Sequence, residues 1–278
     1  MKIAYTAWTW LQDEHNNWEP MSQRPKRDFE QSLRDLHDCG YKYLEDFNVV
    51  EGIYRDDVDE LKALLKKYEM EFVNLYCYFT HDFESDLEVF KRCLTFMNKM
   101  DIRMMNIEPP RKAPGQVVTT EEIIALAEKC NIVGKLCADA GVGLYLHPHW
   151  GTYIETENQI DLLLEHTNRD YLNLCLDTAH TTLCGMNPAK LFDKYLEMGV
   201  VKYIHMKDIN GDPDSYPEYP PRRFRALGYG IVDFPAVQKV LQKHGYDGVL
   251  CVELDFNRVN NYDSAKRSRQ YIHDVLGY

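Results

Sequence analysis

Several short apolar segments of this chain end in side chains that can bind a metal ion or move a proton. These side chains are Glu108 after residues 102–107, His147 and His149 after 142–146, Asp177 and His180 after 172–176, His205 and Lys207 after 200–204, and Glu253 after 249–252. Carboxylates and imidazoles together suit divalent cations such as Mn, Co, Zn or Mg. The same groups are the usual general acids and bases of enzymes. The pattern therefore indicates an enzyme with one metal site.

Each of these residues, taken alone, also has an ordinary structural explanation. A single histidine at a strand end commonly hydrogen-bonds within a core, Asp177 can cap a helix, and Glu253 can form an ion pair. Four successive predicted strands nevertheless end in such residues, and the ends of neighbouring parallel strands meet at one face. His147 and His149 also face the same way, because they are separated by one residue. This coincidence favours a shared metal site.

The apolar segments alternate with helical segments along the whole chain. The predicted strands cover residues 2–8, 41–47, 72–79, 102–107, 142–146, 172–176, 200–204 and 249–252. Segments such as 25–39 and 119–141 carry apolar residues at helical spacing and end at a glycine. Strict alternation gives a parallel sheet, and eight such units close into a barrel. We predict an α/β protein with a single (β/α)8 TIM barrel domain over residues 1–278.

Composition and charge restrict the class of function. The chain is 45% hydrophobic and 27% charged, as in ordinary globular proteins, and no segment approaches the ~20 apolar residues of a membrane span. The N-terminus lacks a signal-peptide pattern, so we expect a cytoplasmic protein whose eight scattered cysteines are reduced. The net charge of -12 argues against binding nucleic acid, which needs clustered Lys and Arg. Small neutral substrates and cations remain as partners.

The motifs at the last three strand ends resemble those of a known family. Asp177-Thr178-x-His180, then His205-x-Lys207-Asp208, then a strand ending in Glu253, is similar to the xylose-isomerase-like TIM-barrel superfamily. That group contains sugar isomerases, ketose 3-epimerases, inosose dehydratases and apurinic endonucleases of the endonuclease IV type. The resemblance extends over essentially the whole chain and implies a (β/α)8 barrel with a divalent metal ion.

The resemblance also implies a set of metal ligands. Three of the family's ligands fall on Asp177, His205 and Glu253, whereas the fourth position, a glutamate in many relatives, is His147 in this chain. Either His147 replaces that glutamate as a ligand, or Glu108 from the preceding strand reaches in. The substitution removes a carboxylate that in ketose epimerases both binds metal and moves a proton. Simple two-carboxylate epimerisation is therefore not favoured.

Within the superfamily, the segment from His147 to Thr152 most resembles the histidine-rich segment of inosose dehydratases. The large subunit of C-glycoside deglycosidases, which act on 3-keto-glycosides, is a second relative. Both eliminate a group β to a ketone on a polyhydroxylated ring. The resemblance thus implies metal-dependent proton removal α to a carbonyl of a keto-sugar or cyclitol, followed by isomerisation, epimerisation or dehydration.

Four residues near the predicted metal ion are candidates for proton transfer. His149 is the first choice as base because imidazole titrates close to neutrality, and Glu108 is the second. We expect His180 and Lys207 to hold substrate oxygens or to protonate a leaving group. An ion pair between Lys207 and Asp208 is the structural alternative.

Three further residues are predicted to bind the substrate. Trp10 and Trp150 could stack on the apolar face of a sugar, although core packing would also explain them. Arg222, in the long irregular segment 210–232, could clamp an anionic group, or it could lie in a solvated loop.

Two other classes of function compete with the sugar enzyme. An endonuclease IV-type DNA-repair enzyme needs a basic groove, which the charge of -12 does not favour. A barrel without catalytic activity would not need ligand-type residues at four strand ends. The sequence leaves open a homo-oligomer or a small accessory subunit.

Overall fold

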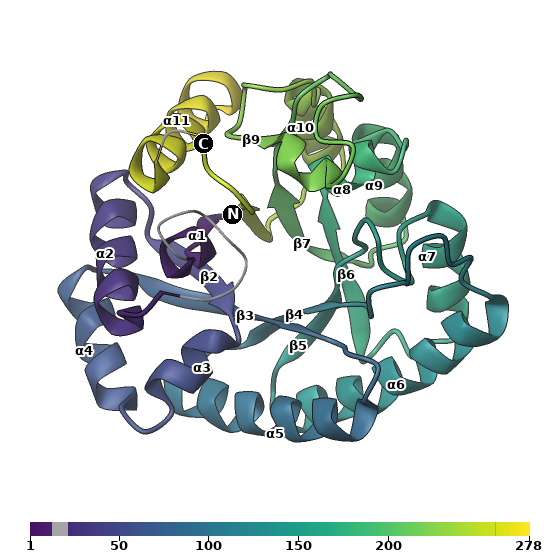
Figure 1. Cartoon of the computed structure of the whole chain (residues 1–278), viewed down its shortest axis with the longest axis horizontal. Coiled ribbons are helices and arrows are strands. Elements are labelled where there is room, and N and C mark those ends of the chain that lie inside the picture. The colour runs from purple at the N-terminus through teal and green to yellow at the C-terminus, as the bar shows by residue number, and fades with distance from the viewer. Residues whose placement is uncertain (13–21, 259) are drawn as a thin grey trace.

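Eight parallel strands close into a barrel in the part of the chain that the structure describes (Figure 1). The structure is a computed structural model and describes residues 1–12, 22–258 and 260–278. The barrel strands are β1 (Lys2–Thr6), β2 (Tyr43–Phe47), β3 (Glu71–Tyr78), β4 (Met104–Glu108), β5 (Gly143–Leu146), β6 (Leu172–Asp177), β7 (Val201–Met206) and β10 (Val249–Val252). They pair in the order β1-β10-β7-β6-β5-β4-β3-β2, so the predicted (β/α)8 barrel is confirmed.

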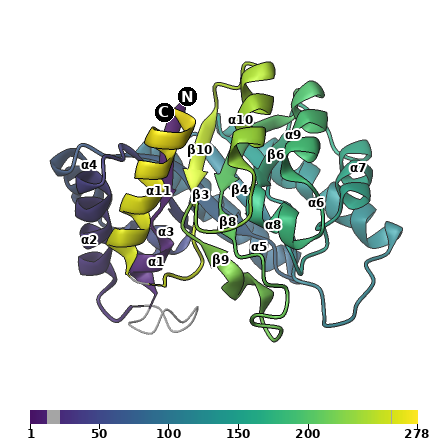
Figure 2. The ribbon, with the colours of Figure 1, turned by 90° about the horizontal axis from the view of Figure 1, so that it is seen from above.

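Helices surround this barrel on its outer side, except the short α1, which lies inside the ring of the other helices in Figure 1 (Figures 1 and 2). They are α1 (Trp8–Leu11), α2 (Pro25–Asp38), α3 (Val49–Tyr54), α4 (Val58–Lys67), α5 (Phe83–Met100), α6 (Thr120–Asp139), α7 (Glu157–Glu165), α8 (Thr178–Leu183), α9 (Pro188–Glu197), α10 (Phe234–Lys243) and α11 (Asn261–Leu276). The predicted start of α6 is confirmed, because Thr119 and Glu122 form a reciprocal capping box. Within the described ranges, no helix combines the length and apolar character needed to cross a bilayer.

The first predicted strand, residues 2–8, was wrong at its end. Strand β1 stops at Thr6, and the next residues fold into the short helix α1. All residues of α1 are buried, so no polar position reveals a helical period in its sequence. A short buried helix and a short buried strand have the same apolar composition, and only packing distinguishes them. The other strand boundaries differ from the predicted ones by no more than about two residues, the usual uncertainty at element ends.

The interior of the barrel contains a small packed layer directly beneath the strand ends. The layer consists of Ala4, Val73, Cys175, Tyr203, Val249 and Cys251. Side chains two positions apart on a strand point the same way. Asp177, His205 and Glu253 each follow a member of this layer by two positions, so they form the next layer toward the C-terminal mouth. The packed layer therefore acts as the floor of the site.

The segment 210–232, predicted as irregular, is partly ordered by a small sheet. Strand β8 (Asp208–Ile209) pairs antiparallel with β9 (Phe224–Arg225), and a 3-10 turn, η1 (Pro220–Arg223), precedes β9. Asp208 holds this loop, because its carboxylate accepts four backbone hydrogen bonds of 2.8–3.1 Å, from the N–H groups of Ile209, Gly228, Gly230 and Val232. Lys207 pairs with Glu253 and Asp255, so the structural alternative of an ion pair with Asp208 is wrong.

The four backbone hydrogen bonds to the Asp208 carboxylate lead to a test of stability. Each carboxylate oxygen accepts two N–H groups, so the amide of Asp208→Asn would point a donor at donors in either orientation. We expect the substitution to lower the free energy of unfolding by about 2–3 kcal/mol, measured by urea denaturation. Asp214→Asn, an exposed change in the same loop, is the control. Equal free energies of unfolding of the two variants would show that these hydrogen bonds do not hold the loop.

Candidate active site

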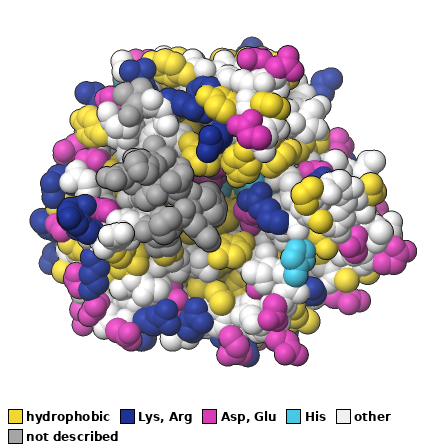
Figure 3. All heavy atoms as spheres, viewed as in Figure 1, with side chains coloured by type: hydrophobic (Ala, Val, Ile, Leu, Met, Phe, Trp, Pro, Cys, Tyr) yellow, Lys and Arg dark blue, Asp and Glu magenta, His cyan; other side chains and the backbone are white. Residues whose placement is uncertain are grey.

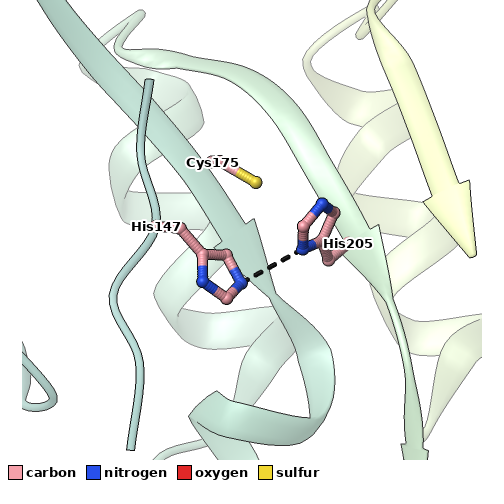
Figure 4. Close-up of side chains that lie close together, drawn as sticks. All are labelled: His147, Cys175 and His205. Carbon is pink, nitrogen blue, oxygen red and sulfur yellow. Dashed lines mark hydrogen bonds between the residues drawn. The ribbon is translucent and has the colours of Figure 1, made fainter. Parts of the chain in front are cut away.

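Four buried side chains meet at the C-terminal mouth of the barrel. They are His147 directly after β5, Asp177 at the end of β6, His205 on β7 and Glu253 directly after β10, and one ligand atom from each lies within 4.8 Å of all the others. We call them the four-ligand cluster. His147 Nε2 lies 3.1 Å from His205 Nδ1, and Figure 4 shows the two rings pointing toward one another. His205 Nδ1 is 2.8 Å from Glu253 Oε2. Two imidazoles and two carboxylates in this arrangement could hold one divalent cation.

Within the cluster, the carboxylate of Asp177 is the group that best suits a bound cation. Asp177 Oδ1 accepts the backbone N–H of His180 at 2.6 Å and caps α8, whereas its Oδ2 is buried without a hydrogen bond. This oxygen lies 3.8 Å from His147 Nε2 and 3.9 Å from the Lys207 ammonium. Asp177 is therefore both the N-cap and a member of the cluster, so the two interpretations of this residue do not exclude one another. A buried carboxylate oxygen without a donor is costly unless a positive charge is near.

Glu45 on β2 orients His205 from the side away from the cluster. Its carboxylate lies 2.9 Å from His205 Nε2 and also accepts hydrogen bonds from Thr6 Oγ1 at 2.9 Å and Asn106 Nδ2 at 2.7 Å. His205 Nδ1 is thereby directed at the cluster. Burial alone would lower the pKa of His205, but the Cys175 thiol and the carboxylates of Glu45 and Glu253 outweigh it and hold this pKa well above its usual value.

A chain of polar groups orients His147 in the same way. His147 Nδ1 lies 2.9 Å from the Tyr76 hydroxyl, which is 3.1 Å from Glu108 Oε2, and Glu108 Oε1 is 2.8 Å from Arg111 Nε. When the Tyr76 hydroxyl donates to Glu108, its oxygen accepts the Nδ1 proton of His147. The lone pair of Nε2 then faces the cluster. Between the two sequence-derived alternatives, the geometry thus brings His147 into the cluster and leaves Glu108 outside it.

His149 and His180 form a stacked pair at the edge of the cluster. Their ring centroids are 3.6 Å apart, and both side chains are almost fully buried. Burial lowers the pKa of both rings well below the ordinary value, and the nearby Arg111 and Lys207 lower it further. His149 Nδ1 lies 2.6 Å from the Trp150 carbonyl oxygen, which can only accept, so Nδ1 carries the proton. The Nε2 lone pair of His149 is left available.

Lys207 supplies a buried positive charge beside the cluster. Its Nζ lies 2.8 Å from Asp255 Oδ1, 3.0 Å from Glu253 Oε2 and 3.3 Å from His180 Nε2. Burial by itself would lower the pKa of Lys207, but Asp255 and Glu253 raise it above its ordinary value, so the ammonium stays charged. The same charge helps to hold the pKa of Glu253 well below its usual range, against the effect of burial.

The three predicted substrate-binding residues lie in different environments. Trp10 is buried, donates its indole N–H to Asp35 at 2.8 Å and packs edge-on against Tyr5, which are the contacts of a packing residue. Trp150 lines a pocket beside the site. Arg222 is exposed and lies over the Phe256 ring, with 5.9 Å between its guanidinium carbon and the ring centroid.

Sequence reasoning did not identify the contacts of four residues that support the site. Glu45 and Asp255 stand at predicted strand ends, so their positions were visible but their partners were not. Tyr76 and Arg111 reach the site from a separate strand and loop, so their contacts with His147 and Glu108 could not be read from the sequence. Only the closure of the barrel brings them to the histidines.

Comparison with known proteins places the chain in a family. The family model described as "Xylose isomerase-like TIM barrel" matches residues 33–274. The inosose dehydratase of Clostridium beijerinckii is 26% identical over 90% of both chains, and that of Clostridium perfringens strain 13 is 28% identical over 97% of this chain and 95% of its own. A crystal structure of the IolI protein with a bound zinc atom superposes with a TM-score of 0.79 at 19% identity, covering 100% of this chain and 98% of that one.

The similarity to proteins named inosose dehydratase, together with ionisable groups at the strand ends of a parallel barrel, indicates an enzyme of the sugar isomerase, epimerase or lyase type. The chain belongs to the xylose isomerase-like TIM barrel family. This confirms the family resemblance derived from the strand-end motifs.

The chain of contacts through Tyr76 leads to a second test. Tyr76→Phe keeps the ring but removes the hydroxyl between His147 and Glu108, so the orientation of His147 is no longer fixed. We expect the affinity for divalent metal to fall about 10–100-fold, as for other residues that orient metal ligands, measured by chelator competition with Mn²⁺, Co²⁺ and Zn²⁺. Tyr229→Phe, an exposed tyrosine, is the control. Unchanged affinity in Tyr76→Phe would rule out this positioning role.

Proposed function

We propose that this chain removes the proton α to the carbonyl of a keto-sugar or cyclitol in a divalent-metal-dependent reaction, most similar to that of inosose dehydratases. The observation that carries the proposal is the four-ligand cluster, with the stacked pair His149 and His180 at its edge. Ligand-type groups and proton-carrying groups at one buried site suit chemistry in which a carbonyl is polarised while a proton moves.

The relatives support the class of substrate. The curated proteins at 26–28% identity are named inosose dehydratase, and this chain spans 88–95% of their length. Proton removal next to a ketone leads either to isomerisation or epimerisation, when the proton returns to carbon, or to dehydration, when a β-hydroxyl leaves. The absence of a glutamate at the His147 position favours dehydration, because the second carboxylate of an epimerase is lacking.

We assign the metal site to His147, Asp177, His205 and Glu253. A divalent cation bound there, Mn, Co, Zn or Mg, would act as a Lewis acid toward a carbonyl oxygen and disperse the negative charge that develops on it. The Asp177 Oδ2, which accepts no hydrogen bond, and the Nε2 lone pair of His147 support this assignment, since both suit a cation as partner. Glu45 and Tyr76 would fix the two imidazoles.

His149 is proposed as the base, and Lys207 together with His180 as the acid. The Nε2 of His149 accepts the α-proton while the electron pair of the C–H bond moves into the carbonyl, giving an enolate. Burial and nearby positive charges keep His149 neutral, so the lone pair is available at neutral pH. In a dehydration, the charged Lys207 ammonium would supply the proton for the departing hydroxyl through the neutral His180 ring, whose Nε2 lies 3.3 Å from Lys207 Nζ. The Lys207 ammonium stabilises negative charge on a substrate oxygen.

The metal assignment is tested with single substitutions. Asp177→Ala, His205→Ala and Glu253→Ala should each lose bound divalent metal and activity while the circular dichroism spectrum stays that of the folded barrel. The reason is that each side chain supplies one donor atom to the cluster. Metal content is measured by elemental analysis after dialysis. Stoichiometric metal in all three variants would refute the assignment.

The role of His149 is tested by hydrogen exchange. His149→Ala should keep its metal and bind substrate nearly normally but lose about 10²–10⁴ in rate, the usual contribution of a positioned acid or base. Exchange of the substrate α-hydrogen in deuterated water, followed by NMR with 2-keto-inositol, ketohexoses and 3-keto-glucosides, isolates this step and identifies the substrate. Undiminished exchange in the variant would move the role to Glu108 or His180.

A further inference from the structure

We propose that the substrate carries a second, uncharged ring, which binds in a pocket next to the four-ligand cluster. This inference rests on the proposed function, because it assumes that a keto ring binds at the cluster. The pocket has a volume of about 960 Å³, and its walls include Arg111, Trp150, Leu183, Cys184 and Tyr219. In Figure 3 the face seen in Figure 1 is hollowed near the barrel mouth, with hydrophobic and Lys or Arg side chains along the rim.

Residues that line the pocket are direct neighbours of the proposed catalytic residues. Arg111 lines the pocket, and its Nη1 lies 3.3 Å from His149 Nδ1. Trp150 directly follows His149 in the chain, and Leu183 ends the helix α8 whose first turn carries His180. A substrate ring held beside the stacked histidines therefore lies next to this space, and a substituent on that ring can extend into it.

The size of the pocket exceeds what a single ring requires. Ligand pockets in proteins commonly measure ~300–1,000 Å³, so a volume of about 960 Å³ is at the upper end of this range. None of the four cluster residues lines it, so this volume lies beside the space at the cluster. A cyclitol bound at the cluster would leave this pocket filled with solvent.

The charges around the pocket favour an uncharged occupant. Lys112 forms an ion pair with Glu155, and Glu155 also accepts the Gly151 N–H at 2.7 Å. Arg111 is paired with Glu108 at 2.8 Å. Both cations are thus paired with carboxylates, and Glu218 adds a negative charge to the lining, so among the described residues an anionic group such as a phosphate has no free positive partner in this pocket.

The aromatic side chains favour a ring. Trp150 and Tyr219 meet edge-to-face with 6.0 Å between ring centroids, and both are partly exposed in the pocket. Such surfaces bind flat groups with an apolar face. An aryl group and a second sugar both have this shape, so the occupant is either an aromatic aglycone or a glycosyl unit of a keto-glycoside.

The experiment compares three ligands with the same keto ring. Methyl 3-keto-glucoside, phenyl 3-keto-glucoside and a disaccharide with that keto ring are titrated calorimetrically into Mn²⁺-loaded His149→Ala protein, in which turnover is slowed. We expect at least one ligand with a second ring to bind about tenfold more tightly than the methyl compound, as stacking on an aromatic wall implies. The ligand that gains affinity identifies the ring as aryl or glycosyl.

Substitutions that fill the pocket with a larger side chain provide the matched control for this binding experiment. Ala113 and Pro114 are exposed loop residues that line the pocket, whereas Val117 is 86% exposed in the same loop and does not line it. Ala113→Trp, with Pro114→Trp as a second blocking variant, should abolish the gain from the second ring and leave methyl-ligand binding unchanged. Val117→Trp should leave both unchanged. Circular dichroism confirms folding of each variant.

The outcomes separate the two proposals. If the methyl ligand binds but neither larger ligand gains affinity, or if the gain survives in a folded blocking variant, the pocket proposal is overturned and the proposed function stands. If none of the three ligands binds to the metal-loaded protein, the keto ring is not bound at the cluster, and both proposals fail together.

Discussion

Buried negative charge at the mouth of the barrel is the constraint on which the site depends. Glu45, Asp177, Glu253 and Asp255 lie with at most 5% of their surface exposed, and Lys207 is the buried ammonium among them. Burying a charge costs several kcal/mol unless it is paired or hydrogen-bonded. In the barrel, Thr6 and Asn106 donate hydrogen bonds to Glu45, and the Lys207 ammonium lies between Glu253 and Asp255. The raised pKa of His205 adds a second positive charge. The buried carboxylates still outnumber these positive charges, so the site attracts a further cation.

The polar residues behind the histidines decide what each ring can do. Glu45 and Tyr76 direct one nitrogen of His205 and one of His147 at the cluster, whereas the Trp150 carbonyl fixes the proton of His149 on the side away from its available lone pair. Three imidazoles within one small volume are thus divided between ligand-type and base-type geometry. The division is set by neighbours and not by residue type, because an isolated imidazole can use either nitrogen.

A loop segment above the strands covers part of the site. The segment with β8, β9 and η1 places Tyr219 and Phe224 over the site. Phe224 packs edge-on against His180, at 4.8 Å between ring centroids, and lies 4.6 Å from the Lys207 ammonium, so it shields both from water. Asp208 anchors this segment through backbone N–H groups. The proposed pocket is therefore formed by loop residues, whereas the proposed metal ligands stand at the strand ends.

The sequence by itself determined the barrel, because eight apolar segments alternating with amphipathic helices have few ways to bury their surfaces. It also determined that His147, Asp177, His205 and Glu253 lie at one mouth, since each ends a strand and parallel strands end together. It did not determine whether His147 or Glu108 enters the cluster, that Trp10 packs against α2, or that Lys207 pairs with Asp255. Those outcomes depend on distances between side chains far apart in the chain, such as Tyr76 to His147. Local pattern carries no information on such distances, and only the closed tertiary structure sets them.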